Sequence, residues 1–143
     1  MGNEVSVSKA KFSVAISTPS IQKLINDTLG DPKRAQRFTA SISSVVAANP
    51  ALQECEAFTV INSALVGEAL ELPPSPQLGY FYMVPFNDNA NKRKVATFIL
   101  GYKGYIQLAI RSGLYKDIDV FEVKEGEYMG RDHETGKPLF SFL

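Results

Sequence analysis

The sequence predicts an α+β fold in which N-terminal helices pack on a small antiparallel sheet with a strand-hairpin-helix core. Apolar residues recur at helical spacing between residues 18 and 72. Beyond Pro76 they follow strand patterns, in two segments separated by a polar turn. Of the 143 residues 45% are hydrophobic and 21% are charged, which is enough apolar material for the core of one soluble domain.

Three helices are expected in the first half of the chain, over residues 18–30, 31–48 and 60–72. The first two begin with Thr18-Pro19 and Asp31-Pro32, which place a capping residue before a proline in the first turn. Glycine or proline follows each helix and ends it. Residues 1–17 lack strong turn chemistry, so we expect them to form a flexible N-terminal arm, with the core domain over residues 18–143.

The second half of the chain predicts two hairpins with a helix between them. Strands are expected over residues 79–86 and 94–100, a helix over residues 103–112, a further strand over residues 118–124 and a second hairpin over residues 127–143. The sequence stops within the apolar run of residues 140–143, so we expect the core domain to be truncated at its C-terminus.

The most informative stretch is residues 98–113, where a hydrophobic strand turns through glycines into a helix. Such a junction brings backbone N–H groups and a positive dipole end to the surface, which suits an anion such as phosphate. Lys103, Gln107 and Arg111 follow one another at steps of four residues, so we expect them on one polar face while the apolar residues pack elsewhere. The alternative is that this face serves solubility alone.

Net neutrality hides a segregation of charge along the chain. Residues 89–116 hold six cations and no acid, whereas residues 38–91 hold five acids and no cation, and residues 117–134 hold seven acids against two cations. This sorting predicts a cationic stripe that faces a polyanionic partner. Lys92, Arg93 and Lys94 lie at the predicted hairpin turn, where they either bind such a partner or form an ordinary exposed turn.

Several classes of protein find no support in the sequence. No apolar run is long enough to span a membrane, and no secretory signal is present. The single cysteine, Cys55, excludes an internal disulfide and fits a reducing cytoplasm. The sequence holds no phosphate loop of an ATPase and no serine-centred elbow, and His133 has no second histidine or cysteine nearby.

Three segments together carry a family resemblance. They are Leu70-Glu71-Leu72-Pro73-Pro74, the strand from Gly79 to Phe86, and the stretch from Phe98 to Gly113 with its Gly101-Tyr102-Lys103-Gly104 and Arg111-Ser112-Gly113. In this order and spacing the chain, from about residue 19 to residue 143, resembles the RecT family of phage single-strand annealing recombinases. The combination is much more specific than any one glycine motif.

The resemblance implies a protein that is not an enzyme: it binds single-stranded DNA and anneals complementary strands without ATP, cofactor or metal, in phage-type homologous recombination. The implied location is the cytoplasm of a bacterial host. The implied partners are single-stranded DNA, the annealed duplex, further copies in a ring or helical filament, a phage exonuclease and a host single-strand-binding protein. Relatives are longer at the C-terminus.

Lys103 and Arg111, by their place in the matching motif, are expected to contact DNA phosphates, and Tyr102 and Tyr105 are expected to stack on bases or sugars. Stacking on an aromatic side chain contributes about 1–3 kcal/mol per base. The full set of expected DNA-binding residues is Lys103, Arg111, Tyr102, Tyr105, Gln107, Gly104, Lys92, Arg93 and Lys94.

Two other functions remain open from the residues themselves. Asp117, Asp119, Glu122 and Lys124 resemble the carboxylates and lysine of a metal-dependent nuclease. The same residues are also typical of an acidic edge that faces solvent. A scaffold is the second alternative, because segregated acidic and basic stretches favour head-to-tail self-assembly.

Overall fold

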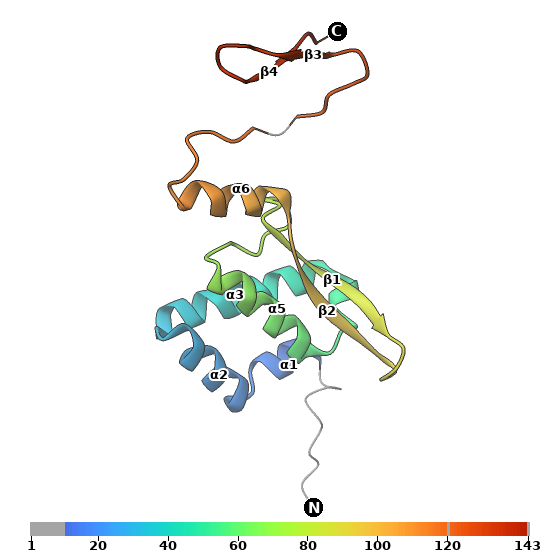
Figure 1. The fold of residues 1–143 in the computed structure, drawn as a ribbon. Coiled ribbons are helices and arrows are strands. Elements are labelled where there is room, and N and C mark those ends of the chain that lie inside the picture. The colour runs from blue at the N-terminus through green and yellow to red at the C-terminus, as the bar shows by residue number, and fades with distance from the viewer. Residues whose placement is uncertain (1–10, 120, 143) are drawn as a thin grey trace, which may run out of the picture.

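A computed structural model gives the structure of the protein and describes residues 11–119 and 121–142. Its first half is a body of helices and its second half contains two separate antiparallel hairpins, so the predicted α+β fold class is confirmed (Figure 1). The helices of the body are α1 (Phe12–Ile16), α2 (Pro19–Leu29), α3 (Pro32–Ala48), α4 (Pro50–Gln53) and α5 (Ala57–Ala69).

Local sequence signals set the ends of α2 and α3. Each has a proline in its first turn, and Asp31 accepts a hydrogen bond from the N–H of Lys33 at the start of α3. Helix α2 ends at Gly30, whose φ of 71° is the left-handed conformation that glycine adopts without strain. The third predicted helix forms as α5, which begins at Ala57 and ends at Ala69.

Helix α5 lies at the centre of the hydrophobic core. Its Val60 and Ile61 are fully buried, together with Ile25 of α2 and Ile42 of α3. Gly67 of α5 lies directly against the ring of Phe81, where a Cβ atom would approach ring carbons to 2.4 Å. The helix therefore serves as the platform on which the first hairpin packs.

The predicted N-terminal arm extends too far into the chain. Phe12, Ala15 and Ile16 are buried in the core on α1, because their spacing places all three on one side of a helix. The same spacing is visible in the sequence and argues against an arm that extends to residue 17. The rest of the expected arm, residues 1–10, lies outside the described residues.

The first hairpin consists of β1 (Phe81–Asp88) and β2 (Arg93–Leu100), paired from Phe81↔Leu100 at one end to Asp88↔Arg93 at the other. Side chains of α5 hold β2 by hydrogen bonds to both backbone groups of Ala96. The N–H of Ala96 donates to Thr59 Oγ1 at 2.9 Å, and Ser63 Oγ donates to the carbonyl of Ala96 at 3.1 Å. Since Ser63 is buried, these bonds fix the register of β2 on the helix.

Helix α6 (Tyr102–Arg111) follows β2 directly and lies across the end of the hairpin, outside the helical body (Figure 1). An extended segment then leads to the second hairpin, β3 (Tyr128–Arg131) and β4 (Pro138–Phe140), where the predicted second hairpin is confirmed. The strand expected over residues 118–124 does not form in its described residues. Phe121 instead packs its ring against Phe140 and Phe142, with centroids 5.0 and 5.7 Å away.

Candidate nucleic-acid interface

The junction between β2 and α6 is a contact of backbone against backbone. The N–H of Gly101 donates to the carbonyl of Tyr80 at 2.9 Å. A Cβ atom on Gly101 would lie 2.3 Å from the carbonyl oxygen of Gly79, and one on Gly104 would lie 2.2 Å from that of Tyr80. The first turn of α6 therefore approaches this segment at a distance that only glycine permits. Gly104 is buried, so its place in the motif is explained by packing.

The same turn presents groups that suit an anion. No side chain caps α6 at Gly101, and the first N–H groups of a helix have no partner within it. Lys103 is exposed in this turn, and among the described residues it forms no salt bridge. A Cβ on Gly79 would lie 3.4 Å from Lys103 Cδ and 3.0 Å from Tyr82 Oη, so the lysine stem and the tyrosine hydroxyl both lie beside this glycine. Sequence reasoning left Tyr82 out of the site.

Arg111 is exposed, as Lys103 is, but its guanidinium already has partners in the chain. Its Nη1 and Nη2 donate to the carbonyls of Leu70 and Glu71, each at 2.9 Å. These carbonyls lie at the end of α5, where the last helical carbonyls lack partners within the helix, so they are available to accept from the guanidinium.

Both polar and aromatic side chains of α6 reach solvent. Tyr102 and Tyr105 are 61% and 63% exposed, Lys103 and Arg111 are also exposed, and Gln107 is half-buried. The apolar residues expected to pack do so only in part, because Ile106, Leu108 and Ala109 are half-buried whereas Ile110 is 50% exposed. Two aromatic rings beside Lys103 form a surface on which nucleic-acid bases could stack.

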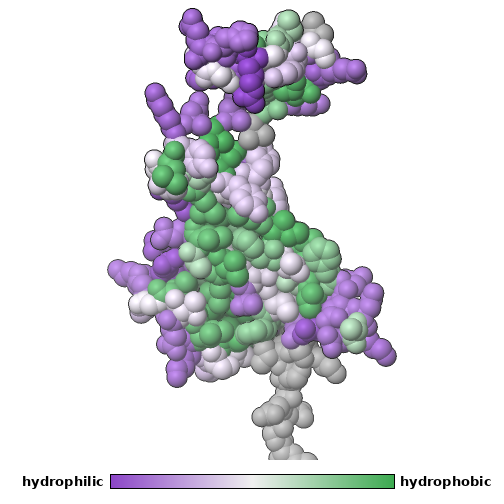
Figure 2. All heavy atoms as spheres, in the orientation of Figure 1, coloured by the Kyte–Doolittle hydropathy of each residue, from purple (hydrophilic) through white to green (hydrophobic). Residues whose placement is uncertain are grey.

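The tip of the first hairpin carries the second group of predicted site residues, and Figure 2 shows hydrophilic side chains gathered there. Arg93 donates to Glu56 Oε2 at 2.6 Å and to Asp88 Oδ2 at 3.2 Å, and Lys94 forms an ion pair with Glu54. Hydrogen bonding to these carboxylates raises the pKa of both Arg93 and Lys94. Only Lys92, exposed at the turn with a φ of 51°, has no salt bridge among the described residues.

These ion pairs correct the interpretation of the charge segregation. Three acids of residues 38–91 pair with two of the six cations of residues 89–116 inside one chain. Arg93 and Lys94 are thus partly neutralised by the fold, which leaves fewer charges for a scaffold that assembles through charge. The two predicted groups also lie apart, because seven strand steps from Leu100 to Arg93 span about 23 Å.

The nuclease alternative gains no support from the structure. Within the described residues no group of three or more His, Cys, Asp and Glu side chains could hold a metal ion. Asp117, Asp119, Glu122 and Lys124 lie on the extended segment after α6, and all four are exposed. No helix among the described residues could cross a membrane.

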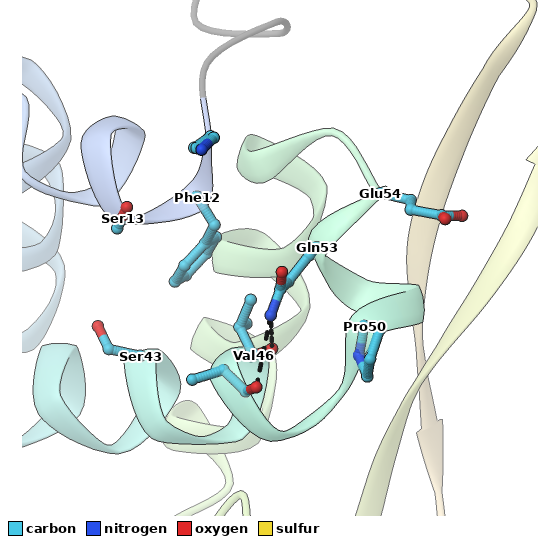
Figure 3. A pocket seen from close by; sticks show the side chains of 9 residues that line it. Phe12, Ser13, Ser43, Val46, Pro50, Gln53 and Glu54 are labelled. Carbon is cyan, nitrogen blue, oxygen red and sulfur yellow. Dashed lines mark hydrogen bonds between the residues drawn. The ribbon is translucent and has the colours of Figure 1, made fainter.

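A hollow of about 610 Å³ lies between α1, α3 and α4 (Figure 3), and one of its lining residues, Glu54, pairs with Lys94 of the hairpin tip. Its lining also includes Phe12, Val46 and Gln53, and the amide of Gln53 donates to the carbonyls of Val46 and Ala47 at the end of α3. The donor groups of this amide are therefore already bonded to the backbone. We assign no function to this hollow.

Comparison with known proteins adds an independent observation. Residues 36–142 match the RecT family. The chain is 45% identical over 112 residues to the uncharacterized protein YqaK of Bacillus subtilis (strain 168), covering 78% of the chain and 37% of YqaK. It is 29% identical over 114 residues to protein RecT of Escherichia coli (strain K12), covering 78% of the chain and 42% of RecT. The chain thus spans less than half the length of either relative.

Proposed function

The chain belongs to the RecT family, and from this premise we propose that it binds single-stranded DNA and anneals complementary strands without ATP in phage-type recombination. Pairing of complementary strands is downhill in free energy, so a protein that aligns them needs no energy source. The sequence accordingly holds no glycine-rich loop with the lysine and hydroxyl of an ATPase.

One observation carries the proposal: the uncapped first turn of α6 exposes Lys103 together with two tyrosines, Tyr102 and Tyr105. In our proposal the ammonium group of Lys103 and the free N–H groups bind phosphate, and the tyrosine rings stack on bases. Neither contact reads a base edge, so binding is expected to tolerate any sequence. Stacking on one face leaves the pairing edge of a base available to a second strand.

The other predicted residues take different parts in this proposal. Arg111 holds α6 in place and Gly104 permits its close approach, so both are positioning residues, whereas the half-buried Gln107 stays a proposed DNA contact on the same helix. Lys92 adds a phosphate contact at the hairpin tip. Assembly with further copies, and association with a phage exonuclease and a host single-strand-binding protein in a bacterial cytoplasm, belong to the same proposal through the family resemblance.

The test mixes two complementary labelled oligonucleotides with the protein and magnesium but no ATP, and follows duplex formation and strand length on a gel. We expect faster pairing with intact strands. The variant Tyr102→Ala/Tyr105→Ala should lose most of this acceleration, because two stacking contacts of about 1–3 kcal/mol each are removed.

Tyr115→Ala is the matched control, since Tyr115 is similarly exposed but lies beyond the end of α6. Shortened strands would instead favour the nuclease, with Asp117, Asp119, Glu122 and Lys124 as the next residues to change. Equal loss in control and variant would remove the tyrosines of α6 from the site.

A further inference from the structure

Two cations at the hairpin tip are occupied by carboxylates of the helical body. Arg93 donates to Glu56 Oε2 at 2.6 Å, and Lys94 pairs with Glu54. Arg93 and Lys94 are nevertheless about half exposed, at 45% and 46% of their side-chain surface. Solvent and dissolved anions therefore reach both cations without any change of fold.

Glu54 and Glu56 are held in position by the backbone around them. They end α4 and precede α5, respectively, and the N–H of Glu56 donates to the carbonyl of Lys94 at 2.9 Å. Figure 3 shows the side chain of Glu54 directed away from the nearby hollow, toward the strands of the hairpin. The two carboxylates thus occupy the place at the tip that a phosphate oxygen would otherwise take.

Carboxylate and phosphate oxygens compete for the same donors on Arg and Lys. Ion pairs that remain exposed are weak and are screened by salt, so a phosphate can exchange for the carboxylate. The exchange still costs the ion pair already formed. A cation held in this way contributes less to DNA binding than one that is free.

We propose that Glu54 and Glu56 tune the DNA site of this chain by competing with phosphates for Lys94 and Arg93. The inference rests on the proposed function and adds its regulation: Lys103 and Lys92 bind DNA directly, whereas Arg93 and Lys94 bind only in exchange for a carboxylate. A single phosphate gains little at the tip. A strand already bound at α6, about 23 Å away along the hairpin, supplies phosphates there at high local concentration.

The test measures the affinity of an oligo-dT strand for the full chain by fluorescence anisotropy, at several salt concentrations. For Glu54→Gln/Glu56→Gln we expect binding about threefold tighter than wild type at low salt, because Lys94 is released, whereas Arg93 loses Glu56 but keeps Asp88 Oδ2 at 3.2 Å. The plot of log affinity against log salt should steepen by about 0.7, the value for one phosphate contact on a single strand.

Glu125→Gln/Glu134→Gln is the matched control, because it changes the net charge equally at two exposed residues outside the tip. In addition, Arg93→Gln/Lys94→Gln should cost little in the wild type and should abolish the gain in the Glu54→Gln/Glu56→Gln background. Thermal melting of each variant checks that it folds. If the double variant does not fold, Glu54→Gln alone replaces it, since this side chain is 60% exposed.

The outcomes separate this inference from the proposed function. Wild-type binding with equal affinities for Glu54→Gln/Glu56→Gln and its control would overturn the competition and leave the annealing proposal standing. The carboxylates would then only brace the hairpin on the body. No binding of oligo-dT by wild type or variants would overturn both.

Discussion

The two ends of the first hairpin look alike in sequence and differ in structure. Both carry cations within residues 89–116, which contain no acid. At the α6 end Lys103 forms no salt bridge with any described residue, whereas at the tip Arg93 and Lys94 are both paired with carboxylates. The comparison teaches that cations in a sequence are free to bind an anionic partner only where the fold places no acidic side chain beside them. The α6 end is therefore the primary candidate site.

The largest effect on stability and DNA binding should come from preventing the close approach of α6 to the hairpin. Gly104→Ala places a Cβ 2.2 Å from a backbone carbonyl oxygen that cannot rotate away, so α6 must shift from the hairpin. We expect a loss of about 3 kcal/mol in the free energy of unfolding, at the upper end for overpacked sites, and a loss of DNA binding. Urea denaturation and anisotropy measure the two.

Gly113→Ala is the control for that substitution. A Cβ at Gly113 meets nothing within 4 Å, and the cost there is only that of a left-handed φ of 72°, about 1 kcal/mol. Equal destabilisation by the two variants would mean that the close approach of α6 is not what Gly104 provides.

The next effect concerns Arg111, which links α6 to the end of α5. Arg111→Ala removes two hydrogen bonds to the carbonyls of Leu70 and Glu71, and we expect a loss of about 1–2 kcal/mol in the free energy of unfolding. Arg111→Lys should recover only part of this lost stability, because an ammonium group lacks the planar guanidinium geometry that reaches both carbonyls. If Arg111→Ala keeps full stability while its salt dependence of DNA binding flattens, the residue contacts phosphate after all.

A smaller effect, on DNA binding alone, is expected from removing the unpaired charge at the α6 end. Lys103→Ala should weaken oligo-dT binding about threefold at low salt and reduce the salt slope by about 0.7, since one phosphate contact is lost. Stability should stay within about 0.5 kcal/mol, as for most surface substitutions. Lys23→Ala on α2 is the control, an exposed lysine on another helix, and an identical response to both would show that only net charge matters.

The smallest effect is the pH dependence of the tip. Hydrogen bonding and attraction to Lys94 lower the pKa of Glu54 below its ordinary 4.5. The ion pair thus contributes stability above pH 4.5, and this contribution disappears as the pH falls through the lowered pKa. Glu54→Gln should therefore differ most from wild type near pH 7 and converge with it in acid, in parallel denaturant series. A difference that grows in acid would contradict the assignment of the pair.

Local signals in the sequence were sufficient for the elements that depend on neighbouring residues. Proline in the first turn and the glycine after α2 placed α2 and α3, and alternation around the polar turn placed β1 and β2. Helix α1 was missed because it is five residues long and its pattern fills little more than one turn. Its burial depends on contacts with α3 and α5, which no local window contains.

The candidate site could be located from the sequence, but the partners of its cations could not. The Gly-Tyr-Lys-Gly motif correctly marked the start of α6. The carbonyls that bind Arg111 lie about 40 residues earlier in the chain. The partners of Lys94 and Arg93 are equally remote, since Glu54 and Glu56 lie 40 and 37 residues away. The only hint was the absence of cations from residues 38–91.

Cys55 lies between the two glutamates that pair with the hairpin tip, and it is the only cysteine in the sequence. Burial raises its pKa, so the thiol is protonated and shielded while the turn stays against β2. A thiol reagent would react when that turn opens, and only at one atom of the chain. The rate at which a thiol reagent labels Cys55 would therefore measure how often this turn separates from β2. Comparing the rates with and without DNA would show whether DNA changes that opening.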